Sequence, residues 1–401
     1  MKDLFKPNQR IFIAGSSNEP TSLLAEVQSV ELPEHLEFIQ FPLAGFNTID
    51  FTQFSETSNL TTFFMTPSLR QADPSRLHFL PMQMRSVYDY LKQGVDVVLF
   101  QVAYDQHGNL RLGPNVDFME AALQSASVWI AELNRSFVAP FGSIPIDKRR
   151  IDYLFDSDRP LHQMPLPNLD PAATRIGELV SELIVDGSCI QTGIGAIPAA
   201  ILSQLSDKND LGMHGGLIDD AGRDLIDLGV LSGKSKTIDN AKHVVGMALG
   251  TDKLYEWLAF QEDVVFRGAD YTHEVSVISQ IDDFVSINSA VEIDLYGQIN
   301  SEFAGGRQIS GTGGSVDFMR AAKSSKRGKS IVAMNATAKN GEVSRIVQKV
   351  ELVTALRTDV DIVVTEFGVA NLKNLPVNQR ADALIEIAAP QFREQLRRST
   401  G

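Results

Sequence analysis

The sequence predicts an α/β protein made of two tandem duplicated open α/β domains, with a cleft between the halves. Three observations indicate this arrangement. The chain has 401 residues, which is too long for one ordinary hydrophobic core. A segment near the N-terminus has a counterpart in the middle of the chain, and two similar apolar runs follow these segments in the same order.

The first pair of segments predicts a strand, a glycine loop and a helix in each half. Residues 7–27 (PNQRIFIAGSSNEPTSLLAEV) correspond to residues 186–205 (DGSCIQTGIGAIPAAILSQL). In both segments an apolar run ends at glycine, and proline stands five residues after that glycine, followed by helix-forming residues. Proline is common in the first turn of a helix.

The second pair predicts central strands of parallel sheets. Residues 95–103 (VDVVLFQVA) and 360–370 (VDIVVTEFGVA) are continuous β-branched apolar runs entered through Val-Asp. Such runs are typical of strands buried on both faces. Chance similarity of α/β composition is the alternative, but two pairs in the same order favour duplication.

A proline-rich stretch predicts the boundary between the halves. Residues 164–175 (MPLPNLDPAATR) have the composition of a semi-extended linker, and a helical pattern follows over residues 173–187. We therefore expect an N-terminal domain over residues 1–170 and a C-terminal domain over residues 171–401. The cleft between two such domains is the default ligand site.

Charge and composition limit the partners and the compartment. The net charge of −14 argues against nucleic-acid or anionic-membrane partners. Cys189 is the single cysteine and cannot form an internal disulfide, so we expect a small buried hydrophobe and a reducing cytoplasm. The first residues lack a signal-peptide pattern, and no apolar run reaches about 18 residues. The sequence therefore predicts a cytoplasmic location and no membrane span.

A glycine loop in the second half is suited to binding an anion. Residues 310–315 (SGTGGS) stand between a predicted strand (GRQIS) and a predicted helix (SVDFMRAAKSS). Successive glycines let backbone N–H groups converge, and the N-terminus of a helix adds partial positive charge. Such a loop can hold a phosphate or an oxyanion.

Several motifs together resemble the acetyl-CoA hydrolase and 4-hydroxybutyrate CoA-transferase family, the class I CoA-transferases. They are QTGIGAIP (191–198), INSAVEIDL (287–295), GQINSE (297–302), GGSVDF (313–318), SRIV (344–347) and VVTEFGVANL (363–372). The resemblance implies the tandem fold, an active-site cleft between the halves and an acyl-CoA substrate. It also implies a homo-oligomer and no permanently bound cofactor. The sequence shows no metal-ligand spacing and no dinucleotide fingerprint.

The resemblance also implies which residues bind the substrate. In the first glycine motif these are Gln191, Gly193 and Gly195, and in the second they are Gly311, Gly313, Gly314 and Ser315, which replaces the family's glutamine. A basic cluster, Lys323, Lys326, Arg327 and Lys329, follows the second motif. Lys326 and Arg327 are candidates for the CoA phosphates, and a solvated loop is the alternative.

The catalytic position departs from the family pattern. By resemblance, members use a glutamate that attacks the thioester and becomes a glutamyl-CoA thioester. That glutamate lies in a segment like D-L-G-x-H-T-E-M, which here is DLGMHGGL (210–217), so its position is Gly216. Where relatives have Y-x-N-D-P, this chain has Tyr-Thr-His-Glu-Val, with His273 in the asparagine position. These changes and Ser315 lie around the expected pocket, while the scaffold motifs are kept, so they predict altered chemistry or specificity.

Three hypotheses follow from the missing nucleophile. In the first, a hydrolase or CoA-transferase uses another carboxylate (Glu302, Glu274 or Asp219) or water, with His214 or His273 as a base that titrates near neutrality. In the second, an amine or alcohol acceptor attacks the acyl-CoA directly. In the third, the protein binds CoA without catalysis. Glu302 is either a carboxylate at the thioester or a solvated strand-end group, and His214 is either a base or a core or loop histidine.

Overall fold

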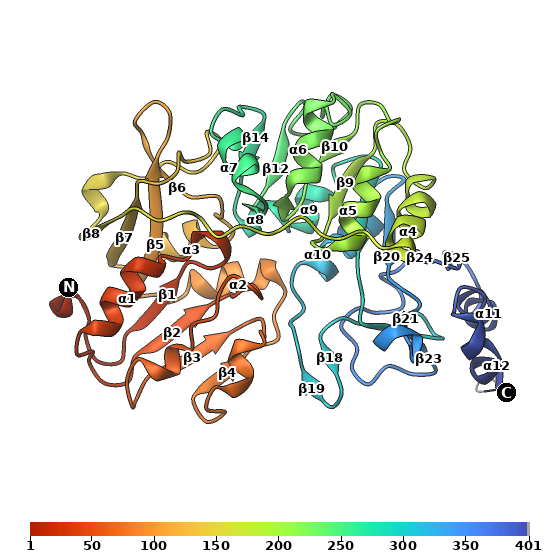
Figure 1. Cartoon of the computed structure of the whole chain (residues 1–401), viewed down its shortest axis with the longest axis horizontal. Helices are drawn as coiled ribbons and strands as arrows, with labels where there is room; N and C mark the ends of the chain where they lie inside the picture. Colours follow the sequence, from red (N-terminus) through yellow and green to blue (C-terminus); the bar gives the residue numbers. More distant parts are fainter. Residues whose placement is uncertain (399–401) are drawn as a thin grey trace.

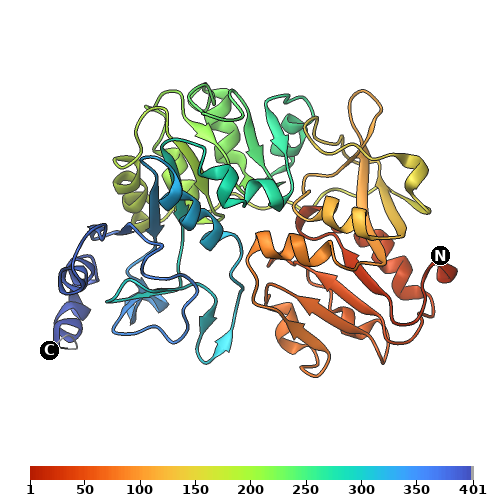
Figure 2. The same cartoon turned by 180° about the vertical axis from the view of Figure 1, so that it is seen from behind.

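Two open α/β sheets, one in each half of the chain, form the framework of the molecule (Figures 1 and 2). The computed structural model describes residues 1–398. The first sheet has the order β4-β3-β2-β1-β5-β7-β8; neighbours on this path are parallel, and β6 pairs antiparallel with β5. The strands are β1 (Arg10–Ile13), β2 (Glu37–Gln40), β3 (Asn59–Thr62), β4 (Leu77–Phe79), β5 (Val97–Tyr104), β6 (Leu110–Leu112), β7 (Val128–Asn134) and β8 (Tyr153–Ser157).

The helices of the first half connect the parallel strands. They are α1 (Thr21–Ser29), α2 (Met84–Leu91) and α3 (Met119–Ser125), with 3-10 turns η1 (Lys2–Leu4), η2 (Ser16–Asn18), η3 (Phe51–Gln53), η4 (Ser68–Gln71) and η5 (Lys148–Arg150). In α2, Met84, Val87, Tyr88 and Leu91 are buried, at the three- and four-residue spacing of one helix face.

The second sheet has the order β10-β9-β15-β20-β24-β25. Its strands are β9 (Cys189–Thr192), β10 (Gly212–Met213), β15 (Phe284–Asn288), β20 (Lys329–Ala333), β24 (Ile362–Thr365) and the antiparallel edge strand β25 (Gly368–Asn371). Cys189 is buried in β9, as expected of a small hydrophobe, and burial raises the pKa of its thiol to about 12.

Shorter elements surround this sheet. The helices are α4 (Pro171–Ser181), α5 (Ala196–Ser203), α6 (Asp220–Asp227), α7 (Asp252–Leu258), α8 (Ala269–Thr272), α9 (Val275–Ile278), α10 (Ser315–Ser324), α11 (Val377–Glu386) and α12 (Pro390–Arg398), with the 3-10 turn η6 (Lys339–Gly341). The small paired strands are β11 (Leu217–Ile218) with β13 (Met247–Ala248), β12 (His243–Val245) with β14 (Val264–Phe266), β16 (Glu292–Asp294) with β17 (Ile299–Asn300) and β23 (Ile346–Val347), β18 (Phe303–Ala304) with β19 (Arg307–Gln308), and β21 (Thr337–Ala338) with β22 (Val343–Ser344).

The first of the two segment pairs occupies corresponding places in the sheets, and the second does not. β1 and β9 each begin a strand–loop–helix unit inside a parallel sheet. β5 lies next to β1, whereas β24 lies three strands away from β9. The run over residues 360–370 is not one central strand, because it turns back at Gly368 (φ +147) and continues as β25. Glycine accepts this backbone conformation without steric cost.

The linker between the sheets crosses the surface in an irregular extended path, drawn in yellow to yellow-green in Figure 1. Its Met164 N–H donates to Gly250 O at 2.9 Å, and the Tyr255 hydroxyl donates to His162 O at 3.0 Å. Asp170 then caps α4 by accepting from Ala173 N at 2.7 Å, with Pro171 in the first turn. This is the sequence pattern of a helix start.

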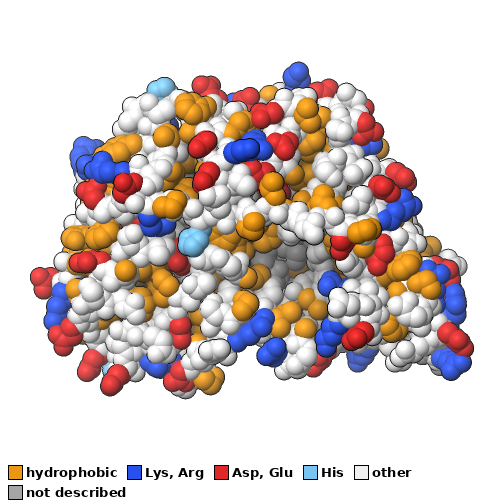
Figure 3. Space-filling view, viewed as in Figure 1, with side chains coloured by type: hydrophobic (Ala, Val, Ile, Leu, Met, Phe, Trp, Pro, Cys, Tyr) orange, Lys and Arg blue, Asp and Glu red, His pale blue; other side chains and the backbone are white. Residues whose placement is uncertain are grey.

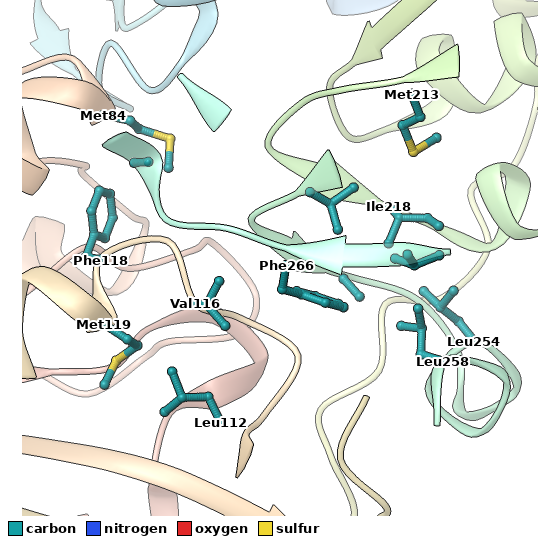
Figure 4. Close-up of a cluster of buried hydrophobic side chains, with 14 of the residues drawn as sticks. Met84, Leu112, Val116, Phe118, Met119, Met213, Ile218, Leu254, Leu258 and Phe266 are labelled. Atoms are coloured by element: carbon teal, nitrogen blue, oxygen red, sulfur yellow. The ribbon is translucent and has the colours of Figure 1, made fainter. Parts of the chain in front are cut away.

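A continuous hydrophobic cluster crosses from one half to the other. Figure 4 shows Met84, Leu112, Val116, Phe118 and Met119 of the first half facing Met213, Ile218, Leu254, Leu258 and Phe266 of the second half. On the face shown in Figure 3, hydrophobic side chains also gather around a recess between the halves. Among residues 1–398, no helix combines the length and the apolar character needed to cross a bilayer.

Candidate active site

The segment with the missing glutamate connects β10 to β11 and is fixed by backbone hydrogen bonds. Gly215 N donates to Val244 O at 3.0 Å. Gly216 O accepts from Gly246 N at 3.2 Å and from Met247 N at 2.9 Å. Position 216 therefore has a defined place at the seam between the halves, because Asn115 of the first half bridges to Met247.

The imidazole of His273 occupies the space beside position 216. A Cβ atom on Gly216 would lie 3.3 Å from His273 Nε2 and 3.4 Å from Cε1. A Cβ atom on Gly314 would lie 2.4 Å from Nε2 of the same ring, and the Phe318 ring centroid is 4.5 Å from the histidine ring centroid. His273 is 1% exposed. The absence of side chains at Gly216 and Gly314 thus leaves room for the ring of His273. A side chain at either position would contact this ring.

The hydrogen bonds around His273 favour one tautomer. The Thr272 hydroxyl has one hydrogen, which it donates to Gly268 O at 3.1 Å. The same hydroxyl lies 2.8 Å from His273 Nδ1 and therefore accepts from Nδ1–H. The lone pair is left on Nε2, the atom next to Gly216 and Gly314. Burial lowers the pKa of His273 to about 3, so the ring is neutral at physiological pH.

His214 is a core histidine in this structure. Its side chain is fully buried, and its ring centroid is 5.9 Å from that of Tyr271. Burial, followed by the charge of Lys236, lowers the pKa of His214 to about 3. The prediction that His214 or His273 titrates near neutrality is therefore wrong, because both rings are removed from water.

The glycine loop 311–314 joins the two halves at the N-terminus of α10. A Cβ atom on Gly311 would lie 2.3 Å from Phe63 O of the first half. Met65 N donates to Ser310 O, and Met84 N donates to Gly313 O, both at 3.3 Å. The glycines thus permit the close approach of a loop from the second half to β3 and α2. The Ser315 hydroxyl donates to Thr312 O at 3.1 Å.

Glu302 forms hydrogen bonds with residues that come just before this loop. Its carboxylate accepts from Thr354 Oγ1 at 2.9 Å and from Gln308 Nε2 at 2.8 Å. Its carbonyl oxygen accepts from Ile309 N at 2.8 Å. Because Glu302 is only 5% exposed, its interpretation as a solvated strand-end group is wrong.

The first glycine motif lines a polar hollow at the N-terminus of α5. Gln191 and Asn288 exchange side-chain amide hydrogen bonds of 3.2 and 3.4 Å. A Cβ atom on Gly193 or Gly195 would meet nothing within 4 Å, which leaves their backbone accessible. The adjoining hollow of about 210 Å³ is lined by residues that include Ser289, Asn335 and Arg345.

Sequence reasoning passed over Arg345 and Asn288, although both lie in quoted motifs, SRIV and INSAVEIDL. Within the described chain, Arg345 Nε and Asn335 Oδ1 are buried polar atoms without a partner. Arg345 and Asn335 line the hollow, so a polar ligand there would lie next to a guanidinium and an amide side chain.

The two other candidate carboxylates have structural partners. Glu274 caps α9 through Ser276 N at 3.0 Å and forms an ion pair with Arg85 at 2.8 Å. Asp219 caps α6 by accepting from Gly222 N at 2.8 Å. Both carboxylates already stabilise helix starts.

The predicted phosphate-binding residues lie at the end of α10 opposite the glycine loop. Lys326 pairs with Asp282 at 3.3 Å, and Arg327 pairs with Asp283 at 2.5 Å. These cations have carboxylate partners on the segment before β15, and their role in CoA binding stays a prediction.

A buried carboxyl that sequence analysis missed lies next to this seam. Asp117 is 3% exposed, and burial raises its pKa to about 8. Its Oδ1 lies 1.8 Å from the place of a Cβ atom on Gly246, and it has no hydrogen-bond partner in the described structure. The only sequence signal was an acidic residue inside the otherwise apolar run Val116–Met119.

Comparison with known proteins agrees with this geometry. Residues 1–159 match the family model described as the acetyl-CoA hydrolase/transferase N-terminal domain, and residues 250–400 match the corresponding C-terminal domain. A 4-hydroxybutyrate coenzyme A transferase of Clostridium kluyveri is 42% identical over 318 residues, covering 78% of this chain and 74% of the relative.

Two solved structures have the same fold over nearly the whole chain. RipA from Yersinia pestis superimposes with a TM-score of 0.92 at 30% identity, covering 100% of this chain and 96% of that one. A 4-hydroxybutyrate CoA-transferase from Porphyromonas gingivalis superimposes with a TM-score of 0.81 at 31% identity, covering 99% and 94%.

Proposed function

Because the chain belongs to the acetyl-CoA hydrolase/transferase family of enzymes, we propose that it acts on an acyl-CoA thioester without the glutamate nucleophile implied by the family pattern. The reaction is hydrolysis or transfer of the acyl group or of CoA. Coenzyme A enters as part of the substrate. We also propose that the protein is cytoplasmic and forms a homo-oligomer.

The observation that carries this proposal is the position of the His273 ring against Gly216. The family pattern aligns the glutamate with residue 216, and a Cβ atom at this position would lie 3.3 Å from the imidazole. Glycine at 216 leaves the ring of His273 in its observed place, whereas a side chain at 216 requires the ring to shift by a few tenths of an ångström. Two linked changes support altered chemistry more than a single lost residue does.

His273 is the group that we assign as base in the hydrolytic reaction. Nε2 accepts a proton from water as the water oxygen attacks the thioester carbonyl carbon. The carbon–sulfur bond then breaks, and the proton passes from Nε2 to the CoA thiolate, which leaves a carboxylic acid and CoA. N–H groups of the glycine loop 311–314 stabilise the oxyanion. Because the ring is 1% exposed and burial lowers its pKa, this step requires substrate binding to bring a water molecule to Nε2.

We assign the other residues to binding and support. The open loop at Gly193 and Gly195, with Gln191, lies beside the polar hollow at Arg345 and is the candidate site for the polar part of the substrate. Glu302 positions the second glycine loop through its hydrogen bonds. In this proposal His214 has a packing role, because its ring is fully buried and its centroid lies 5.9 Å from that of Tyr271.

Thiol release from a panel of acyl-CoA esters tests the proposed function. We expect free CoA to appear with water alone and to depend on His273. Release only with added acetate or succinate would show that another carboxylate has become the nucleophile. Release only with an amine or alcohol would favour direct acyl transfer. Tight CoA binding without any release would contradict catalysis and leave a CoA-binding protein.

A further inference from the structure

The polar hollow of about 210 Å³ lies at the carboxyl edge of the second sheet, where three parallel strands end. Ile194 follows β9, Ser289 follows β15 and Asn335 follows β20. These strands are parallel neighbours, so their carboxyl ends share one edge. The rest of the lining comes from Arg345, from Asp170 and from the starts of α4 and α5. In open α/β folds, the carboxyl edge of the parallel sheet is the usual place for a ligand.

Arg345 gives this hollow a positive charge that no ion pair neutralises. Its Nη1 donates to Ala290 O at 3.3 Å, and no carboxylate of residues 1–398 forms an ion pair with its guanidinium. Burial lowers the pKa of Arg345 and the charge of Glu366 raises it, but the Glu366 carboxylate accepts from Ala336 N at 2.8 Å. A half-buried guanidinium without an ion pair gains from a bound anion, and its planar donors match phosphate oxygens in pairs.

Neutral donors and one carboxylate complete the lining. Ala196 and Ile197 begin α5, whose N-terminus has no side-chain cap, and Asn335 contributes a side-chain amide. Asp170 is exposed, and its carboxylate accepts from Ala173 N at 2.7 Å, so the start of α4 partly compensates its charge. Donors therefore outnumber acceptors in the hollow, which suits an anion with several oxygens.

The strand order relates this hollow to the proposed reacting groups. β10 is the parallel neighbour of β9, and Gly216 follows β10, so the residues after β10, β9, β15 and β20 form a row along one edge. A Cβ atom on Gly215 would lie 2.9 Å from Gln191 Cγ in β9, so the row reaches the segment beside His273. Neighbouring strands are about 4.8 Å apart, so three spacings separate Asn335 from Gly216 by roughly 14 Å.

This separation matches the phosphate end of CoA and not its acyl end. Roughly thirteen bonds join the CoA sulfur to the first phosphorus atom, and an extended chain spans about 3.5 Å for every three bonds, so the pantetheine arm spans about 15 Å. The end carboxylate of a succinyl group is about three bonds from its thioester carbon and reaches less than about 4 Å. The open backbone at Gly193 and Gly195 lies between the two ends of the row and is accessible to the amide groups of the arm.

We propose that Arg345 binds the 5′-diphosphate of CoA in this hollow, while the pantetheine arm runs along the carboxyl edge of β9 and β15 towards Gly216. The inference rests on the proposed acyl-CoA function and names the residue that holds the far end of that substrate. It differs from the candidates Lys326 and Arg327, which already have carboxylate partners. Arg345 has a binding role and takes no part in breaking the thioester.

Binding of CoA and its fragments, without turnover, tests this assignment. CoA, dephospho-CoA, 4′-phosphopantetheine and pantetheine are titrated calorimetrically into the full-length protein at pH 7 with a reductant. The last two share the arm and the thiol, and they differ in the phosphate that the proposal places at Arg345. We expect phosphopantetheine to bind at least about tenfold more tightly than pantetheine, because hydrogen bonds to charged groups are strong. CoA and dephospho-CoA, which differ at the 3′-phosphate, should bind within about threefold of each other.

Variants identify Arg345 as the source of this preference. Arg345→Met should bind phosphopantetheine no more tightly than pantetheine and should bind pantetheine as wild type does. Arg345→Lys keeps the charge but loses the paired donors, so it should keep part of the ratio, and it carries the test if Arg345→Met does not fold. Lys326→Ala combined with Arg327→Ala is the matched control, because it removes two cations elsewhere and should leave the ratio unchanged. Thermal unfolding confirms that each variant is folded.

The results that would overturn the inference are distinguishable from failure of the proposed function. Equal binding of phosphopantetheine and pantetheine to wild type, an unchanged ratio in both Arg345 variants, or loss of the ratio in the double variant removes Arg345 from diphosphate binding. Loss in Arg345→Met of a preference for CoA over dephospho-CoA would place the 3′-phosphate there and refute the diphosphate assignment. The acyl-CoA function survives each of these results. Failure of CoA and of all three fragments to bind refutes that function together with this inference.

Discussion

At the scale of single residues, Gly216, His273 and Gly314 form one steric unit although they are distant in the sequence. The ring of His273 lies against both glycine positions, and a Cβ atom on either glycine would be closer than ordinary van der Waals contact. The resemblance locates the change at 216 and the neighbouring change at 273. Their contact could not be predicted, because it depends on the packing of α8 against the β10–β11 connection.

Gly216→Glu alone should be less active and less stable than Gly216→Glu combined with His273→Asn. Asparagine is smaller than histidine and restores the residue of the family pattern, so the new side chain gains room. We expect a covalent glutamyl-CoA adduct, detected by mass spectrometry after incubation with acyl-CoA, in the double variant. Absence of the adduct in a folded double variant would refute the assignment of position 216 as the nucleophile position.

The stability contributed by the buried neutral His273 should depend on pH. The pKa of the folded state is about 3, below the ordinary value of about 6.5 for an unfolded chain. The unfolded state therefore binds more protons between these values, and stability falls as pH falls below about 6.5.

Urea unfolding of wild type and His273→Gln between pH 7.5 and 5 measures this effect. Because glutamine does not titrate, the stability of wild type relative to the variant should be constant above pH 7. It should then decrease towards acid pH, by at most about 1.4 kcal/mol per pH unit. A difference that is constant down to pH 5 would show that the ring is not buried in its neutral form.

At the scale of elements, the strand–glycine loop–helix units were predictable and their contacts were not. The sequence pattern predicts β9 with α5 and the loop before α10, because apolar runs, glycines and helix formers are local signals. The reversal at Gly368 was missed because a buried hairpin and one long buried strand have the same apolar composition. Asp117 was missed because its burial arises from the other half of the molecule.

Gly314→Ala should disturb the site through His273. The added methyl would lie 2.4 Å from the imidazole, so the ring or the loop must move. We expect activity to fall by at least tenfold and stability to fall by about 1–3 kcal/mol, as for other overpacked positions.

Gly314→Ala combined with His273→Ala is the matched control, because it removes the ring that the methyl group contacts. If the clash is the cause, adding Gly314→Ala to His273→Ala should change stability by much less than adding it to wild type. Equal effects in both backgrounds would mean that the loop backbone, and not the ring, requires glycine at this position.

At the scale of the whole molecule, the two halves have separate sheets and a shared core. We propose that the boundary lies near residue 170, where the linker ends at the cap of α4. The two α/β halves were predictable, and the first pair of repeated segments occupies corresponding places in their sheets, whereas the second pair does not. The hydrophobic cluster that crosses the seam was not, because each half of it appears in the sequence as ordinary apolar positions.

This shared core predicts that both halves unfold in one transition. The chain has two tryptophans, Trp129 in β7 of the first half and Trp257 in α7 of the second half, so each half has its own fluorescence probe. In Trp257→Phe, Trp129 is the remaining tryptophan and reports on the first half. In Trp129→Phe, Trp257 remains and reports on the second half. We expect urea transitions with the same midpoint, after correction for the stability of each variant, because separation of the halves exposes the cluster around Phe266 and Met84.

Phe266→Ala then tests whether the seam transmits stability between the halves. Phe266 is fully buried and belongs to the second half, and its truncation should cost about 3–5 kcal/mol. Because Phe266 belongs to the same hydrophobic cluster as Val116 and Met119 of the first half, the midpoint reported by Trp129 should fall as much as that reported by Trp257. A shift seen by Trp257 alone would show that the halves unfold independently. In that case the candidate site at the seam would lack a rigid common support.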